Sequence, residues 1–265
     1  MTQFIDVDFT NDPRYVPGYS PKYRQMKKRF GAKNFGDSFN VPSAADRREA
    51  AEEMAKAGGG LTRLVTRIYD QSNEGSCVGN MGGQAMEVLQ AKTLGKSFVV
   101  PISAMSMYKQ IGSSPNSGAS VEDCIDRADD TGFLPLDTAE NKARFPATMS
   151  HTGFRQSWPA DWKATAKRFR GIEGIWVNSV EEMETALIFG MPVGVGRAGH
   201  SILYLEPRYD GNSLQICYVN SWGDWGFGAG GFAAGFGLDS SRLFREAADY
   251  CYAFQAADTG NWDWA

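Results

Sequence analysis

Apolar side chains between residues 78 and 89 recur at intervals of three and four. They are Val78, Met81, Ala85, Val88 and Leu89. This spacing places them on one face of an α-helix, so the pattern predicts a helix that starts near Cys77. The glycine-containing turn Gln71–Ser76 precedes that start. The pattern therefore puts a cysteine at a helix N-terminus.

Capping residues and glycine stops predict further helices. A serine followed three residues later by an acidic side chain is typical of a helix start, and glycine is typical of the position just after a helix. Proline also suits the first helical position. On these signals, the predicted helices run from Ser20 to Gly31, Ser43 to Ala57, Ser120 to Gly132 and Ser179 to Phe189.

Short runs rich in β-branched and aromatic residues predict strands in the second half of the chain. The turn Asp210-Gly211-Asn212 lies between two of them and favours a hairpin. The predicted strands are Pro192–Gly196, Ser201–Leu205, Leu214–Asn220 and Asp249–Gln255. Because helices come first and strands follow, the sequence predicts an α+β fold.

The first 60 residues differ from the rest of the chain. They are polar, they contain four prolines, and they end in the triple glycine Gly58-Gly59-Gly60. We therefore expect residues 1–60 to form an N-terminal extension, either an arm or a short prosegment. Residues 61–265 are expected to form the main domain.

Composition excludes several classes of protein. The 265 residues are 42% hydrophobic, which is enough for a substantial core, and the formal charge of −4 gives no general reason to bind nucleic acid. No apolar run is long enough to span a membrane. The first residues carry no secretory signal, so we expect a cytoplasmic protein or a component of a macromolecular assembly.

The cysteines and histidines do not form a metal-binding pattern. The four cysteines, Cys77, Cys124, Cys217 and Cys251, are far apart, and the histidines are limited to His151 and His200. Structural zinc sites use closely spaced cysteines and histidines. We expect no metal and no cofactor.

Three short segments carry the candidate chemistry. Cys77 stands where helix N–H groups favour a thiolate, and Gln71 could hold an oxyanion together with a backbone N–H. His200 begins a predicted strand. Asn220 ends another, and its amide oxygen could orient a histidine while Trp222 shields the bond from water. Each segment alone is equally compatible with a structural role.

Taken together, the order Gln71, Cys77, His200, Asn220 resembles the papain-like cysteine proteases, the C1 family. The Asn-Ser-Trp-Gly signature of that family is present at Asn220–Gly223. The resemblance implies a two-lobed fold, with a helical lobe, an antiparallel β-barrel-like lobe and the active-site cleft between them. It also implies a cysteine endopeptidase that acts through a thioester.

The resemblance assigns roles to individual residues. Cys77 is the implied nucleophile, His200 the acid and base, Asn220 the residue that orients His200, and Gln71 an oxyanion donor. Trp222 is expected to cover the site. The loop at Ser117 and Gly118 resembles the glycine-bearing loop that pairs with the substrate backbone in the family.

The sequence also departs from the family pattern. Glu74 occupies the place of a disulfide-forming cysteine, and it brings a negative charge near a thiolate that prefers positive surroundings. Val78 replaces an aromatic residue. Arg197-Ala198-Gly199 is much shorter than the family's segment before the histidine. Losing the disulfide agrees with a reducing compartment.

Two functions of different classes remain open. The first is a peptidase that acts on a peptide or protein substrate. The second is a papain-like module with little or no activity that serves as a structural or binding component of a larger bacterial or viral assembly. In that second case residues 1–60 are expected to dock on a neighbouring subunit. Neither hypothesis involves nucleic acid or a membrane.

Overall fold

The computed structural model describes residues 6–18, 33–225, 233–247 and 250–256. The predicted helix from Ser20 to Gly31 lies outside these ranges. The α-helices are α1 (Phe35–Ser38), α2 (Ala44–Lys56), α3 (Cys77–Leu94), α4 (Ala104–Ile111), α5 (Val121–Asp130), α6 (Ala139–Arg144), α7 (Trp162–Ala166), α8 (Val180–Ile188) and α9 (Ser241–Ala247). Single 3₁₀ turns are η1 (Phe9–Asn11), η2 (Leu61–Leu64), η3 (Lys96–Phe98) and η4 (Lys167–Phe169).

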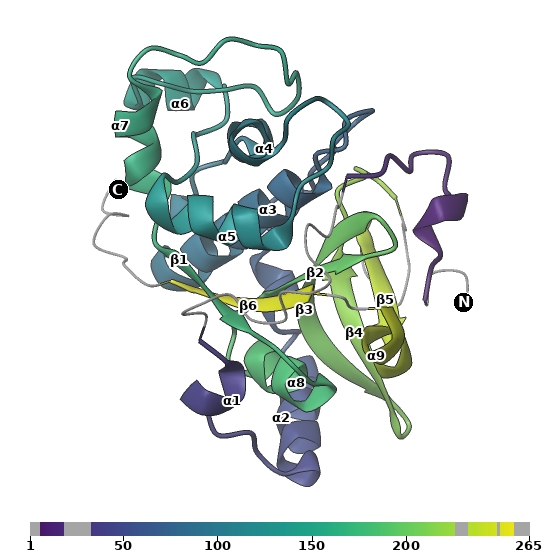
Figure 1. Ribbon diagram of the computed structural model, residues 1–265. Helices are drawn as coiled ribbons and strands as arrows, with labels where there is room; N and C mark the ends of the chain where they lie inside the picture. The colour runs from purple at the N-terminus through teal and green to yellow at the C-terminus, as the bar shows by residue number, and fades with distance from the viewer. Residues whose placement is uncertain (1–5, 19–32, 226–232, 248–249, 257–265) are drawn as a thin grey trace.

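The described strands form a six-stranded antiparallel sheet in the order β1-β6-β2-β3-β4-β5 (Figure 1). They are β1 (Ile172–Trp176), β2 (Val193–Arg197), β3 (His200–Asp210), β4 (Ser213–Val219), β5 (Phe236–Ser240) and β6 (Tyr250–Ala256). The edge strands β1 and β5 do not pair with each other in this order, so the sheet is open. The barrel-like lobe is therefore a twisted sheet that does not close.

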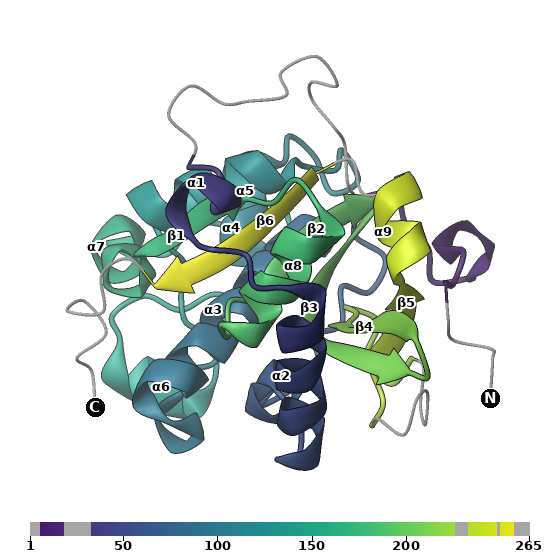
Figure 2. The ribbon, with the colours of Figure 1, turned by 90° about the horizontal axis from the view of Figure 1, so that it is seen from below.

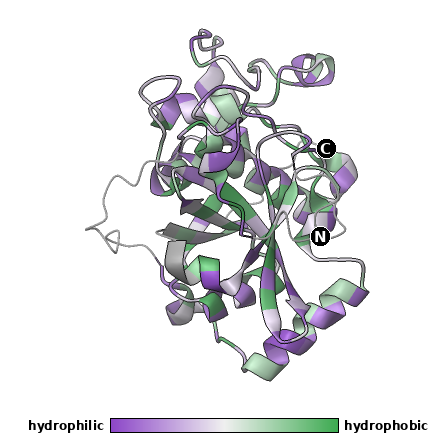
Figure 3. Ribbon diagram, turned by 90° about the vertical axis from the view of Figure 1, so that its right-hand side faces the viewer, coloured by the Kyte–Doolittle hydropathy of each residue, from purple (hydrophilic) through white to green (hydrophobic). Residues whose placement is uncertain are grey.

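Helices cover both faces of this sheet. Helices α3, α4 and α5 lie on one side, and α2 and α8 lie on the other (Figures 1 and 2). Because successive side chains of a strand point to opposite faces, β3 contributes Leu203 and Leu205 to the first core and Ile202 and Tyr204 to the second. Hydrophobic residues accordingly concentrate in the central strands (Figure 3).

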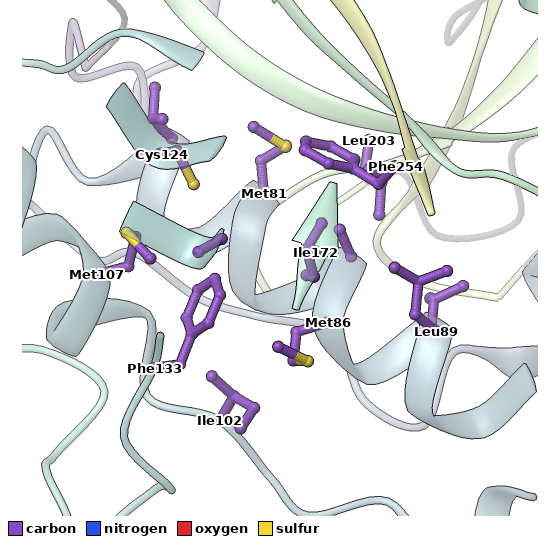
Figure 4. Close-up of a cluster of buried hydrophobic side chains, with 14 of the residues drawn as sticks. Met81, Met86, Leu89, Ile102, Met107, Cys124, Phe133, Ile172, Leu203 and Phe254 are labelled. Atoms are coloured by element: carbon purple, nitrogen blue, oxygen red, sulfur yellow. The ribbon is translucent and has the colours of Figure 1, made fainter. Parts of the chain in front are cut away.

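The first core fixes the position of α3 between the helical lobe and the sheet. Met81 and Leu89 of α3 are almost fully buried, and they lie near Leu203 of β3 and Phe254 of β6 (Figure 4). Burial of each such side chain contributes about 2 kcal/mol. This packing anchors the helix whose first residue is Cys77.

Most of the predicted elements are confirmed within one or two residues. Ser43, Ser120 and Ser179 cap α2, α5 and α8, each by accepting a backbone N–H three residues later. The Asp210–Asn212 turn joins β3 to β4. Strands β1 and β5 and helices α4, α6, α7 and α9 were not predicted, because their segments lack a clear period or cap.

Helix α2, which belongs to the predicted extension, packs on the sheet lobe. The guanidinium of Arg47 is nearly buried and pairs with Glu184 of α8 at 2.7 Å, and Tyr209 of β3 donates to the other Glu184 oxygen at 2.7 Å. The division of the chain after Gly60 stays a prediction. No helix within the described residues is both long enough and apolar enough to cross a membrane.

Candidate active site

Cys77 is the first residue of α3, and its side chain is fully buried. The turn before it is held by its own hydrogen bonds. Asn80, one turn into α3, donates its side-chain amide to the carbonyl of Ser76 at 2.9 Å and to the Ser76 hydroxyl at 3.0 Å. The sulfur therefore lies at a helix start whose first turn is fixed by side-chain bonds.

His200 and Asn220 are brought together by the pairing of β3 with β4. His200 opens β3, Asn220 follows the last residue of β4, and Leu203 pairs with Val219 between them. The Nε2 atom of His200 lies 2.8 Å from Oδ1 of Asn220. Two residues 20 positions apart thus form one buried hydrogen-bonded pair.

The direction of this hydrogen bond follows from its surroundings. Oδ1 of Asn220 also accepts the backbone N–H of Ser221 at 2.7 Å, so it is the amide oxygen that faces His200. His200 therefore donates from Nε2, and a neutral ring then carries a lone pair on Nδ1. That Nδ1 is buried and has no hydrogen-bond partner among the described residues. The ring is in the tautomer that can accept a proton at Nδ1.

Trp222 covers the histidine. Its ring stacks on the His200 ring at a centroid distance of 4.7 Å and an interplanar angle of 28°, and only 2% of Trp222 is exposed. This shielding keeps water from the His200–Asn220 bond. Burial lowers the pKa of His200 to about 4, and the positive charge of Arg197 acts in the same direction.

Gln71 connects the turn before Cys77 to the sheet lobe. Its amide oxygen accepts the hydroxyl of Ser221 at 2.7 Å, and its backbone N–H donates to the Ser221 carbonyl at 2.9 Å. Its amide nitrogen donates to the carbonyl of Glu74 at 2.9 Å. A primary amide carries two N–H donors, so one remains for an oxyanion.

Residues 6–18, called the N-terminal segment below, run over this site. Gly18 donates its backbone N–H to the carbonyl of Gly199 at 3.0 Å and accepts the N–H of Ala119 at 2.9 Å. It thereby bridges the sheet lobe and the helical lobe. A Cβ placed on Gly18 would lie 2.7 Å from the sulfur of Cys77, so the backbone passes directly against the nucleophile.

Phe9 anchors the same segment next to His200. Its fully buried ring meets the rings of His200 and Trp222 edge-on at 4.8 and 5.4 Å. The guanidinium of Arg197 lies 4.2 Å from the Phe9 ring centre, and Arg197 is itself paired with buried Asp239 at 2.9 Å. Such aromatic and cation–π contacts each add about 1 kcal/mol to the burial itself.

The covered site holds Cys77 as a neutral thiol. Burial raises the pKa of Cys77 to about 12, although the backbone N–H groups of Ser201, Val78 and Cys77 itself act in the opposite direction. With the pKa of His200 lowered at the same time, a proton transfer from sulfur to imidazole is unfavourable in this form. An ion pair requires the N-terminal segment to leave.

The structure brings together four of the predicted site residues, Gln71, Cys77, His200 and Asn220, under Trp222. The loop at Ser117 and Gly118 lies beside Gly18, but Ala119, the next residue, makes the backbone contact. The side chain of Ser117 instead bonds within its own loop. Sequence reasoning missed Phe9 and Gly18, because no local pattern marks a segment that bonds to distant parts of the chain.

Comparison with known proteins yields structural relatives. No protein-family model matches the chain, and no curated protein matches its sequence. Xylellain, a cysteine protease from Xylella fastidiosa, matches with a TM-score of 0.63 at 14% identity, over 92% of this chain and 97% of that one. Procathepsin L2 from the larval midgut of Tenebrio molitor matches with a TM-score of 0.61 at 15% identity, over 95% and 83% of the two chains.

A third similar structure is the proform of Amb a 11, a cysteine protease and ragweed pollen allergen. Its TM-score is 0.55 at 15% identity, over 84% of this chain and 80% of that one. These matches show that the chain has the fold of the papain-like cysteine proteases. Since the identities are low, the activity has to be argued from the site itself.

Proposed function

We propose that this protein is a cysteine peptidase of the papain-like C1 family, and that the form described here is its latent state. The observation that carries the proposal is the His200–Asn220 pair, which leaves Nδ1 of a buried imidazole unprotonated beside the start of α3. A structural histidine needs no unpartnered ring nitrogen in a dry site, whereas a general base does. The fold of known cysteine proteases supports the same conclusion.

In the open site, Nδ1 of His200 takes the proton of the Cys77 thiol. The sulfur attacks the carbonyl carbon of a peptide bond, and the carbonyl oxygen becomes an oxyanion. His200 returns the proton to the leaving amine as the C–N bond breaks, and a thioester remains on Cys77. Water, deprotonated by His200, then attacks the thioester and releases the acid together with the free thiol.

The oxyanion is held by the second N–H of the Gln71 amide and by the backbone N–H of Cys77. Donors that are already oriented stabilise the charge more than mobile water does, because they need no reorganisation during the reaction. Gln71 is oriented in advance by Ser221 on one side and Glu74 on the other.

The backbone groups that now bind Gly18 are proposed to bind the substrate main chain. The carbonyl of Gly199 and the N–H of Ala119 lie on opposite sides of the N-terminal segment. An extended polypeptide presents the matching donor and acceptor at each residue. The N-terminal segment therefore competes with the substrate for the same bonds, as expected of a prosegment.

The experiment uses the full-length chain with Gly18→Val, which sets a branched side chain against Cys77. This chain is expected to hydrolyse fluorescein-labelled casein. Adding Cys77→Ala or His200→Ala should abolish the hydrolysis. The matched control is Gly36→Ala in the same extension, since its new methyl group meets only the flexible carboxylate of Glu182.

A second candidate function, a binding module without activity, is favoured by one observation, the complete burial of Cys77. The same experiment separates the two functions. A Gly18→Val chain whose Cys77 reacts rapidly with iodoacetamide, but which leaves casein intact, would overturn the peptidase and support the module.

A further inference from the structure

Glu74 lies three residues before Cys77, at the position where the sequence lacks the disulfide-forming cysteine of the papain-like proteases. Its carboxylate accepts two backbone hydrogen bonds from the loop of residues 150–154. The N–H of Phe154 lies 2.8 Å from Oε1, and the N–H of Gly153 lies 3.1 Å from each carboxylate oxygen. The carboxylate therefore points toward this loop, and its charge is satisfied there.

The same loop makes a second attachment near the nucleophile. Nε2 of His151 lies 2.9 Å from Oδ1 of Asn80, the residue whose amide holds Ser76. Burial lowers the pKa of His151 to about 3, so the ring stays neutral and donates this bond. The loop thus holds the turn through Glu74 and the first turn of α3 through Asn80.

The attachment at Glu74 extends to the oxyanion donor. The carbonyl of Glu74 accepts the Gln71 side-chain amide at 2.9 Å, and the N–H of Glu74 donates to the Gln71 carbonyl at 3.2 Å. Fixing the backbone of Glu74 therefore fixes the direction in which the remaining N–H of Gln71 points. Hydrogen bonds that involve a carboxylate are roughly twice as strong as neutral ones.

We propose that Glu74 is a positioning residue for the oxyanion donor Gln71, and that its bonds to Gly153 and Phe154 do the work of the missing disulfide without a covalent bond. The proposal rests on the proposed peptidase function. All four cysteines of the chain are free. A carboxylate clamp keeps the turn in place where a disulfide would be reduced, so the geometry of the site does not depend on redox conditions.

The test compares Glu74→Ala and Glu74→Gln with Glu140→Ala, a change at an exposed residue of α6. All three are made in the full-length Gly18→Val chain. Turnover of a fluorogenic peptide gives kcat and KM, and iodoacetamide gives the reactivity of Cys77. Alkylation passes through no oxyanion, so it reports the thiolate alone.

Glu74→Ala is expected to lower kcat by at least about tenfold, with KM and the alkylation rate within about twofold. Complete loss of one oxyanion donor costs roughly 10²–10³ in kcat, and here the donor is displaced rather than removed. Glu74→Gln keeps an acceptor oxygen, so it should recover part of kcat. Backbone amides at 153 and 154 should exchange faster with deuterium in Glu74→Ala, and this holds in the latent chain as well.

Two results would overturn the role of Glu74. One is an unchanged kcat in Glu74→Ala despite faster exchange at 153 and 154. The other is an equal fall in kcat and alkylation rate, since that pattern indicates general damage to the site. If the Gly18→Val chain itself cleaves no peptide, the proposed peptidase function fails first, and the exchange data alone still show whether the clamp exists.

Discussion

The backbone of Gly18 lies against the sulfur of Cys77, so close that a methyl group on Gly18 would stand 2.7 Å from the sulfur and 2.6 Å from the carbonyl oxygen of Gly75. Only glycine fits at this crossing. The nucleophile and the segment that covers it therefore depend on each other, and the neutral state of Cys77 is a consequence of that cover.

Gly18→Val is expected to raise the rate of Cys77 alkylation. Overpacking a close contact costs about 1–3 kcal/mol, and the N-terminal segment can relieve it by detaching. The alkylation rate by iodoacetamide at pH 7 should therefore rise roughly tenfold to a hundredfold, as read by peptide mass spectrometry. Gly36→Ala should match the wild type. Equal rates in all three chains would show that the segment does not limit access to Cys77.

Phe9→Ala tests the other anchor of the segment. Removing a buried phenylalanine ring costs about 3–5 kcal/mol, and here the loss falls on the contacts with His200, Trp222 and Arg197. Because the segment can open locally, we expect alkylation of Cys77 to rise on the order of a hundredfold. Phe9→Leu should have a much smaller effect. A fall in the melting temperature without faster alkylation would contradict this interpretation.

The sequence predicted the parts of the site that depend on local signals or on a family signature. The period of Val78 and Met81 and the glycine turn located Cys77 at the start of α3. The Asn220–Gly223 signature located the partner of His200. These signals lie in short stretches of chain, so they survive without knowledge of the tertiary structure.

The covering of the site could not be predicted, because it arises from contacts between residues far apart. Gly18 bonds to Ala119 and Gly199, and Phe9 fits among rings contributed by β3 and by the residues after β4. Glu74 shows the same limit. Its charge suggested an unfavourable neighbour for a thiolate, whereas the loop at Gly153 supplies N–H donors that the sequence does not reveal.

Acid is expected to destabilise the latent form through His200. The pKa of His200 is about 4 in the folded protein, because of burial, and about 6.5 in an unfolded chain. Between these values the unfolded chain binds more protons, so stability is full above pH 6.5 and falls as the pH drops toward 4. The loss attributable to His200 is on the order of 3 kcal/mol.

This pH dependence is measured by urea unfolding at pH 7.5 and pH 4.5, in the wild type and in His200→Gln. Other titrating groups, including His151 and Asp239, are present in both chains, so the difference between them isolates His200. The wild type should lose more stability than the variant on acidification. Parallel losses in both chains would mean that His200 titrates normally in the folded protein.

Asn220→Ala should impair the chemical step of the proposed reaction while leaving the thiol accessible. Without Oδ1, the Nε2–H of His200 has no acceptor, so the ring loses both its preferred tautomer and its orientation. In the full-length Gly18→Val chain, kcat for a fluorogenic peptide is expected to fall at least tenfold, with KM changed little. Asn220→Asp retains an acceptor and should keep more activity than Asn220→Ala. If the two variants lose kcat equally, the amide of Asn220 does not act by orienting His200, and its contribution lies in the Ser221 backbone that it also binds.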